Sequence, residues 1–286
     1  MDATWRAEAL GPARRLELPQ GTIRCHDAGD GPVVVFVHGV LVNANLWRDV
    51  VGRLRDGHRC VALDLPLGGH LEPMPPHADL SPPALADLIA DAIAALELED
   101  VTLVGNDTGG ALSQLVATRR PERLGALVLT SCDAFDNFPP KAMQPLMPLL
   151  KVPGAFAATL QPSRVPAIRR RLMTLLRATK HPVDPRAADA YALPPLRDAR
   201  VRRDALEVMR GLDKRYTLEA AERLRDFDRP AVLAWSREDK FFPPRHAERL
   251  AEILPHGRVE WIDDAYTFSP EDQPARVAEA VAGARR

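Results

Sequence analysis

The segment from Val101 to Ala111 constrains the fold more than any other part of this sequence. Its first four residues are apolar or β-branched and predict a buried strand, and a pattern typical of a helix begins eight residues after Val101. Only a tight turn separates the two elements. Glycines flank that turn and remove Cβ atoms from a crowded backbone, so that the side chain of Asp107 stands clear of the main chain: Gly105, Gly109 and Gly110.

The same alternation of strand and helix continues on both sides of this segment. Short apolar runs predict strands at 33–37, 60–64, 101–104, 126–130, 231–235 and 259–262. Helical patterns cover 44–54, 82–93, 109–118, 245–254 and 274–282. Strands that alternate with helices predict a mostly parallel, doubly wound α/β sheet.

The alternation stops between Phe135 and Arg229. This stretch is rich in Pro, Arg, Leu and Ala and contains no strand pattern. We therefore expect a helical cap at 136–229, inserted after the strand at 126–130, which we count as the sixth strand of the whole sheet. The α/β core would then consist of 1–135 and 230–286.

Overall composition excludes several functional classes. The chain has 286 residues and a net charge of −1, so neither a nucleic acid nor an anionic membrane surface is expected as a partner. No apolar run is long enough to span a bilayer, so we expect no membrane partner. Three cysteines without a CxxC pair, and no signal-peptide pattern, favour a reducing cytoplasm. We find neither a dinucleotide-binding fingerprint nor metal-ligand spacing, and therefore expect no cofactor. A small-molecule substrate is expected, on a monomer or a homodimer.

Three motifs carry a resemblance to a known family. His38-Gly39-Val40 follows the strand at 33–37, Gly105–Gly110 is a G-x-S-x-G turn with aspartate in the serine position, and Asp239 follows the strand at 231–235. In this order and at this spacing, they resemble the α/β-hydrolase superfamily over nearly the whole chain. The resemblance is greatest to its aspartate-nucleophile branch, the haloalkane dehalogenases and epoxide hydrolases.

The resemblance implies a role for each motif. Asp107 would attack carbon and form an ester, with the backbone amides of Val40 and Thr108 as the oxyanion hole and His38 and Gly39 as structural members of that turn. The helix that follows is expected to favour the ionised carboxylate. Asp239 would orient a base, and Asp133 or Asp136 are alternative acids. The other interpretation of Asp107 is a turn or N-cap carboxylate.

The sequence departs from this family at two places. Thr267 stands where the base, a late histidine, is expected, and a hydroxyl has no useful base pKa. His70 lies in the loop after the strand at 60–64, which we count as the fourth strand of the whole sheet. It is the best substitute, although it can equally be a solvated loop histidine. Thr108 and Val40 also replace the tryptophan and asparagine with which dehalogenases usually hold halide.

Three functions remain open at this stage. The first is a hydrolase acting on a small apolar electrophile such as an epoxide, halide, ester or lactone. The second is a lyase, cyclase or isomerase that uses Asp107 as a general base, since burial can raise a carboxylate pKa. The third is a ligand-binding pseudoenzyme that lacks the catalytic histidine.

Overall fold

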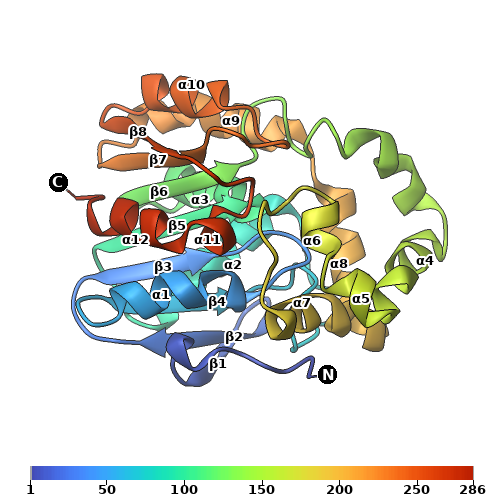
Figure 1. Cartoon of the computed structure of the whole chain (residues 1–286). Coiled ribbons are helices and arrows are strands. Elements are labelled where there is room, and N and C mark those ends of the chain that lie inside the picture. Colours follow the sequence, from blue (N-terminus) through green and yellow to red (C-terminus); the bar gives the residue numbers. More distant parts are fainter. Residues whose placement is uncertain (1, 286) are drawn as a thin grey trace.

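An eight-stranded sheet forms the centre of the computed structural model, which describes residues 2–285 (Figure 1). Its spatial order is β1-β2-β4-β3-β5-β6-β7-β8. The first two strands are antiparallel to their neighbours and the others are parallel. The strands are β1 (Ala13–Leu18), β2 (Gly21–Ala28), β3 (Val33–Val37), β4 (Arg59–Asp64), β5 (Val101–Asp107), β6 (Leu124–Cys132), β7 (Ala231–Ser236) and β8 (Gly257–Ile262).

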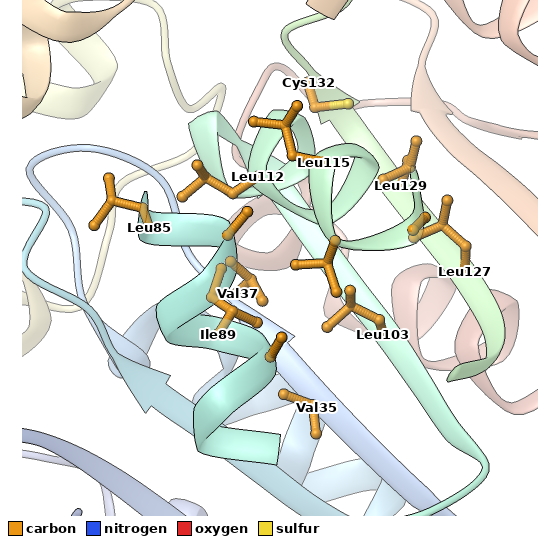
Figure 2. Packing of buried hydrophobic residues seen from close by; sticks show 14 of the residues in the cluster. Val35, Val37, Leu85, Ile89, Leu103, Leu112, Leu115, Leu127, Leu129 and Cys132 are labelled. Carbon is orange, nitrogen blue, oxygen red and sulfur yellow. The ribbon is translucent and has the colours of Figure 1, made fainter. Parts of the chain in front are cut away.

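Helices cover both faces of the sheet because the central strands are apolar on both sides. Val35 and Val37 of β3 point to the face covered by α2 (Pro82–Ala95), α3 (Thr108–Arg119) and α10 (Arg245–Ile253). Figure 2 shows this layer, in which Leu85 and Ile89 pack beside the side chains of α3. The intervening residues of β3 point to the other face, covered by α1 (Arg48–Leu54) and α12 (Pro274–Ala282).

The chain between β6 and β7 is helical, which confirms the predicted insertion after the sixth strand. It comprises η3 (Gln144–Lys151), α4 (Ala155–Leu160), η4 (Gln161–Arg164), α5 (Pro166–Arg169), α6 (Leu172–Leu175), α7 (Pro185–Arg197), α8 (Ala199–Gly211), α9 (Lys214–Arg223) and η5 (Leu224–Asp226). Phe156, Ala205 and Met209 from this insertion pack with Val40 and Leu41, so the insertion covers the turn after β3. None of the helices described in 2–285 is long and apolar enough to cross a membrane.

A buried ion pair within the core accepts a hydrogen bond from the insertion. Arg48 of α1 donates to both carboxylate oxygens of Glu271 in α11 (Ser269–Asp272), each at 2.7 Å, and both side chains are at most 9% exposed. The hydroxyl of Tyr191 in α7 donates to Glu271 Oε1 at 2.6 Å. One carboxylate therefore joins α1, α7 and α11.

Glu271→Ala should lower the free energy of unfolding by about 3–5 kcal/mol, because the substitution removes the buried partner of the Arg48 guanidinium and leaves it only the half-exposed Asp49. Urea denaturation of both proteins measures this difference. Glu279→Ala, which removes an exposed partner of Arg276, is the matched control and should cost less than about 1 kcal/mol. Equal losses in the two variants would contradict the role given to the buried pair.

Candidate active site

Asp107 occupies the strained turn between β5 and α3. Its backbone has φ 54° and ψ −132°, a conformation that costs a non-glycine residue about 1–3 kcal/mol and that clusters at functional sites. The glycines around it are needed sterically. A Cβ at Gly105 would lie 2.6 Å from the carbonyl oxygen of Gly109, and one at Gly110 would overlap Cys132 of β6. The sequence therefore folds into this turn because those positions have no side chain.

The Asp107 carboxylate lies against the turn that follows β3. The amide of Val40 donates to Asp107 Oδ2 at 3.1 Å, and the amide of Thr108 also hydrogen bonds to this carboxylate. A Cβ at Gly39 would overlap Asp107 Oδ2, so only glycine allows this close approach. The two amides expected to form an oxyanion hole thus both contact the side chain of Asp107.

His38 supports this turn from inside the core. The amide of Leu65 donates to Nε2 at 3.0 Å, so the proton is on Nδ1, which donates to the carbonyl of Gly39 at 2.8 Å. Burial lowers the pKa of His38 to about 4, which keeps the ring neutral. His38 therefore positions the backbone at Gly39 and Val40 and has no nitrogen left for a substrate.

Three carboxyl groups, of which Asp107 and Asp133 are buried and Asp239 is half-buried, gather at the carboxyl ends of neighbouring strands. Asp107 ends β5, Asp133 follows β6 and Asp239 follows β7. Burial, together with the charge of Asp239, raises the pKa of Asp107 to about 7, although the amides of Thr108 and Val40 act in the opposite direction. Burial and the charge of Asp107 raise the pKa of Asp133 well above its usual range. The start of α3 was expected to favour the ionised form of Asp107, but desolvation outweighs it.

Asp239 is fixed by its own loop and by Thr267. Its Oδ1 accepts from the amides of Phe241 at 2.7 Å and Phe242 at 2.8 Å, and from the Thr267 hydroxyl at 3.0 Å. Burial raises the pKa of Asp239, and these donors oppose the shift. The hydrogen bond to Asp239 that the resemblance assigns to a base is made here by a threonine hydroxyl.

The structure places His70 in a different set of contacts. Nδ1 accepts from the amide of Gly68 at 3.2 Å, and Nε2 lies 3.2 Å from Oδ2 of Asp204 in α8. Asp204 also accepts from the amide of Met74 at 2.8 Å. His70 is buried rather than solvated. Nδ1 has its partner within the same loop, and Nε2 joins this loop after β4 to the insertion.

Two residues of this region were not singled out from the sequence. Asn106, beside the strained residue, donates to the carbonyl of Thr267 at 2.8 Å and so holds the segment after β8 against the turn. Asp204 pairs with His70 across 134 positions of the chain. The position of Asn106 inside the turn motif was a usable signal, whereas nothing local marks Asp204.

Asp136, the other alternative acid, lies outside this cluster. Its carboxylate is half exposed and pairs with Lys141 at 2.7 Å, an interaction that lowers its pKa.

Across residues 2–285, no group of three His, Cys, Asp or Glu side chains is arranged to hold a metal ion.

Comparison with known proteins agrees with this architecture. Residues 32–274 match the family described as alpha/beta hydrolase fold. Haloalkane dehalogenase 2 of Mycobacterium tuberculosis is 28% identical over 278 residues, which cover 94% of this chain and 93% of that protein. The uncharacterized hydrolase YugF of Bacillus subtilis is 25% identical over 278 residues, 96% of this chain and 98% of that protein.

Solved structures show the same fold at lower identity. The haloalkane dehalogenase DbeA of Bradyrhizobium elkani superposes with a TM-score of 0.76 at 20% identity, covering 95% of this chain and 98% of that one. An alpha/beta hydrolase fold protein of Burkholderia ambifaria gives a TM-score of 0.79 at 20% identity, covering 94% and 96%. The sheet order, the inserted helices and the family match over residues 32–274 together show that this chain belongs to the alpha/beta hydrolase fold family.

Proposed function

We propose that this protein is a hydrolase that acts on a small apolar electrophile through the carboxylate of Asp107. The observation that carries the proposal is the placement of that carboxylate, in a strained turn with Oδ2 held by the amide of Val40. A carboxylate positioned in this way is oriented before the reaction, and its ester would have backbone donors beside its carbonyl oxygen. The distant relation to a haloalkane dehalogenase supports the same chemistry.

For a haloalkane or an epoxide, the first step would form an ester; for an activated ester or a lactone, attack on the acyl carbon would form an anhydride, which water hydrolyses to two acids. A carboxylate oxygen of Asp107 attacks a carbon that bears a leaving group, the bond from carbon to that group breaks, and the group departs with the electron pair. For an epoxide the leaving oxygen stays on the substrate as an alkoxide and takes a proton from water. In the second step water adds to the Asp107 carboxyl carbon, releasing an alcohol and regenerating the acid.

The second step lacks its expected base. Thr267 donates to Asp239 and cannot take a proton from water near neutral pH. Both nitrogens of His70 are engaged with the amide of Gly68 and the carboxylate of Asp204. We therefore propose that ester formation is intrinsically faster than ester hydrolysis in this chain.

One observation favours a second function. A pKa of about 7 at Asp107 is close to the value at which a general base works best at neutral pH. A lyase, cyclase or isomerase that uses Asp107 to remove a proton would need no ester-hydrolysing histidine. This alternative and the hydrolase predict different covalent states of Asp107.

The test is the mass of the intact protein after incubation with a panel of epoxides, haloalkanes, activated esters and lactones. If the protein is a hydrolase of this kind, its mass should increase by that of the substrate fragment bound to Asp107. The Asp107→Asn variant should show no such increase. Peptide mapping should place the added mass on the peptide that contains Asp107. Steady conversion of a substrate with no adduct at any time, in rapid-quench samples as well, would favour the general base. An adduct on another residue would contradict both.

The rate of ester formation should depend on pH through Asp107. The attacking form is the carboxylate, so the rate should fall about tenfold per pH unit below about 7 and level off above it. Asp239→Asn removes a negative charge that raises the pKa of Asp107, so the midpoint should move to lower pH. Adduct formation measured from pH 5 to about 9 checks both expectations. An unchanged midpoint in Asp239→Asn would contradict the coupling of the two carboxyl groups.

A further inference from the structure

Charge is distributed very unevenly along this chain. Residues 137–183, which we call the basic cap segment, contain eight Lys and Arg residues and no Asp or Glu. The rest of the chain carries 30 basic and 39 acidic side chains, a net charge of −9. The overall charge of −1 conceals this separation.

The same segment exposes most of the large apolar side chains that reach the surface. Of the nine such side chains that are exposed in the described part of the chain, eight lie between Met143 and Leu176. Four of them are more than half exposed: Leu146 (54%), Val152 (53%), Leu175 (65%) and Leu176 (56%). Scattered single residues of this kind are ordinary, but such a concentration in one short segment marks an interaction site.

These exposed residues are separate from those that pack the insertion onto the core. Leu150, Phe156 and Leu160 point inward to Ala205 and Met209, next to the turn after β3. The exposed side chains are therefore not needed for that packing. Figure 1 shows α4, α5 and α6 of the basic cap segment together at the end of the molecule away from α12 and the C-terminus.

Several of the basic groups are available to a partner. Arg169 is buried and pairs with Asp189 at 2.8 Å, so its role is structural. Lys151, Arg164 and Arg171 are exposed, and no carboxylate among residues 2–285 forms an ion pair with them. The segment thus presents free cations and aliphatic side chains.

We propose that the basic cap segment is a docking surface for an anionic lipid bilayer. Anionic headgroups attract lysine and arginine near the surface, and the acyl boundary takes exposed leucine and valine side chains. A nucleic acid would satisfy the cations but would leave the leucines in water. The negative charge of the rest of the chain would orient the molecule, with the insertion toward the bilayer and the core away from it.

This proposal goes beyond the proposed function and does not depend on the chemistry at Asp107. It replaces the expectation, based on whole-chain charge, that no anionic membrane surface is a partner. That expectation averaged two regions of opposite sign.

The test is sedimentation of the whole protein with vesicles. Vesicles of phosphatidylcholine mixed with phosphatidylglycerol should bring the protein down, and those of phosphatidylcholine alone should bind it much more weakly. The triple variant Lys151→Gln, Arg164→Gln, Arg171→Gln should lower the partition coefficient about a hundredfold, roughly fivefold for each charge. Leu175→Ser with Leu176→Ser should weaken binding even at low salt.

Matched substitutions on the core provide the controls. Arg53→Gln, Arg55→Gln and Arg276→Gln remove three exposed charges from α1, its C-terminal end and α12, and Leu218→Ser removes an exposed leucine of α9. These variants should bind vesicles as the parent does. All the substituted side chains are exposed, so thermal unfolding should be unchanged in every variant.

Three results would overturn the proposal. One is equal binding to both kinds of vesicle, or none to either. Another is that the variants in the basic cap segment bind anionic vesicles as strongly as the parent protein does. The third is a dimer, seen by sedimentation velocity at the same concentrations, that the Leu175→Ser, Leu176→Ser variant loses. That result would assign the exposed leucines to a second copy of this chain.

Discussion

Asp107→Asn should reduce the rate of product or adduct formation by about 10⁴-fold or more, because an amide has no anionic oxygen to attack carbon or to accept a proton. The loss should come from the chemistry and leave the fold intact. Burial raises the pKa of Asp107 from 3.8 to about 7, so this carboxyl costs the folded protein stability as pH rises between those values, and the cost is complete above pH 7. The asparagine variant should therefore unfold at the same or a higher temperature than the parent at pH 8.

Asp136→Asn is the matched control for that substitution. Its carboxylate is half exposed and pairs with Lys141 outside the carboxyl cluster, so the variant should keep the parent rate. The measurements are the reaction rates of the parent, Asp107→Asn and Asp136→Asn proteins on one substrate, and the melting temperature of each protein. An Asp107→Asn protein that keeps more than about a tenth of the activity would remove this residue from the reaction.

Thr267→His is expected to speed hydrolysis of the ester on Asp107 by about 10²–10⁴-fold, the usual contribution of a positioned general base. The hydrogen bond to Asp239 that the threonine hydroxyl now makes at 3.0 Å would come from one ring nitrogen. The other nitrogen would be available to water. The backbone is already anchored there, since Asn106 donates to the carbonyl of Thr267 at 2.8 Å.

The measurement for this variant is the lifetime of the adduct after excess substrate is removed. Thr267→Gln introduces a side chain similar in size to histidine but without a useful base. The adduct of this variant should therefore last as long as that of the parent. Melting temperatures of both variants show whether the larger side chain is accommodated. A folded Thr267→His protein with an unchanged adduct lifetime would mean that the missing histidine does not limit turnover.

Most of the sheet was predictable because its strands are short, apolar and separated by helical patterns. The prediction of a strand at 126–130 falls inside β6, and the helix expected at 274–282 matches α12. β1 and β2 were not located, since four of the six residues of β1 are exposed and no apolar run identifies either strand. The individual helices of the insertion were not located either; α5 and α6 have four residues each and show no period.

The candidate site was likewise only partly predictable from the sequence. Asp107 and the amides of Val40 and Thr108 could be brought together from motifs, because each motif fixes its own backbone shape. The partner of His70 could not, because Asp204 is far away in sequence and pairs with it only through the packing of α8. The protonation of Asp107 also depends on burial by distant segments, which outweighed the local influence of the helix.

The cluster formed by Asp107, Asp133 and Asp239 has a consequence for what can stay in the site. Burial raises the pKa of all three groups, and a negative charge beside them, such as a halide or a carboxylate product, would raise those pKa values further. A retained anion would therefore keep Asp107 protonated and unable to attack. Neutral compounds impose no such penalty, so the cluster would work best on substrates and products without a charge.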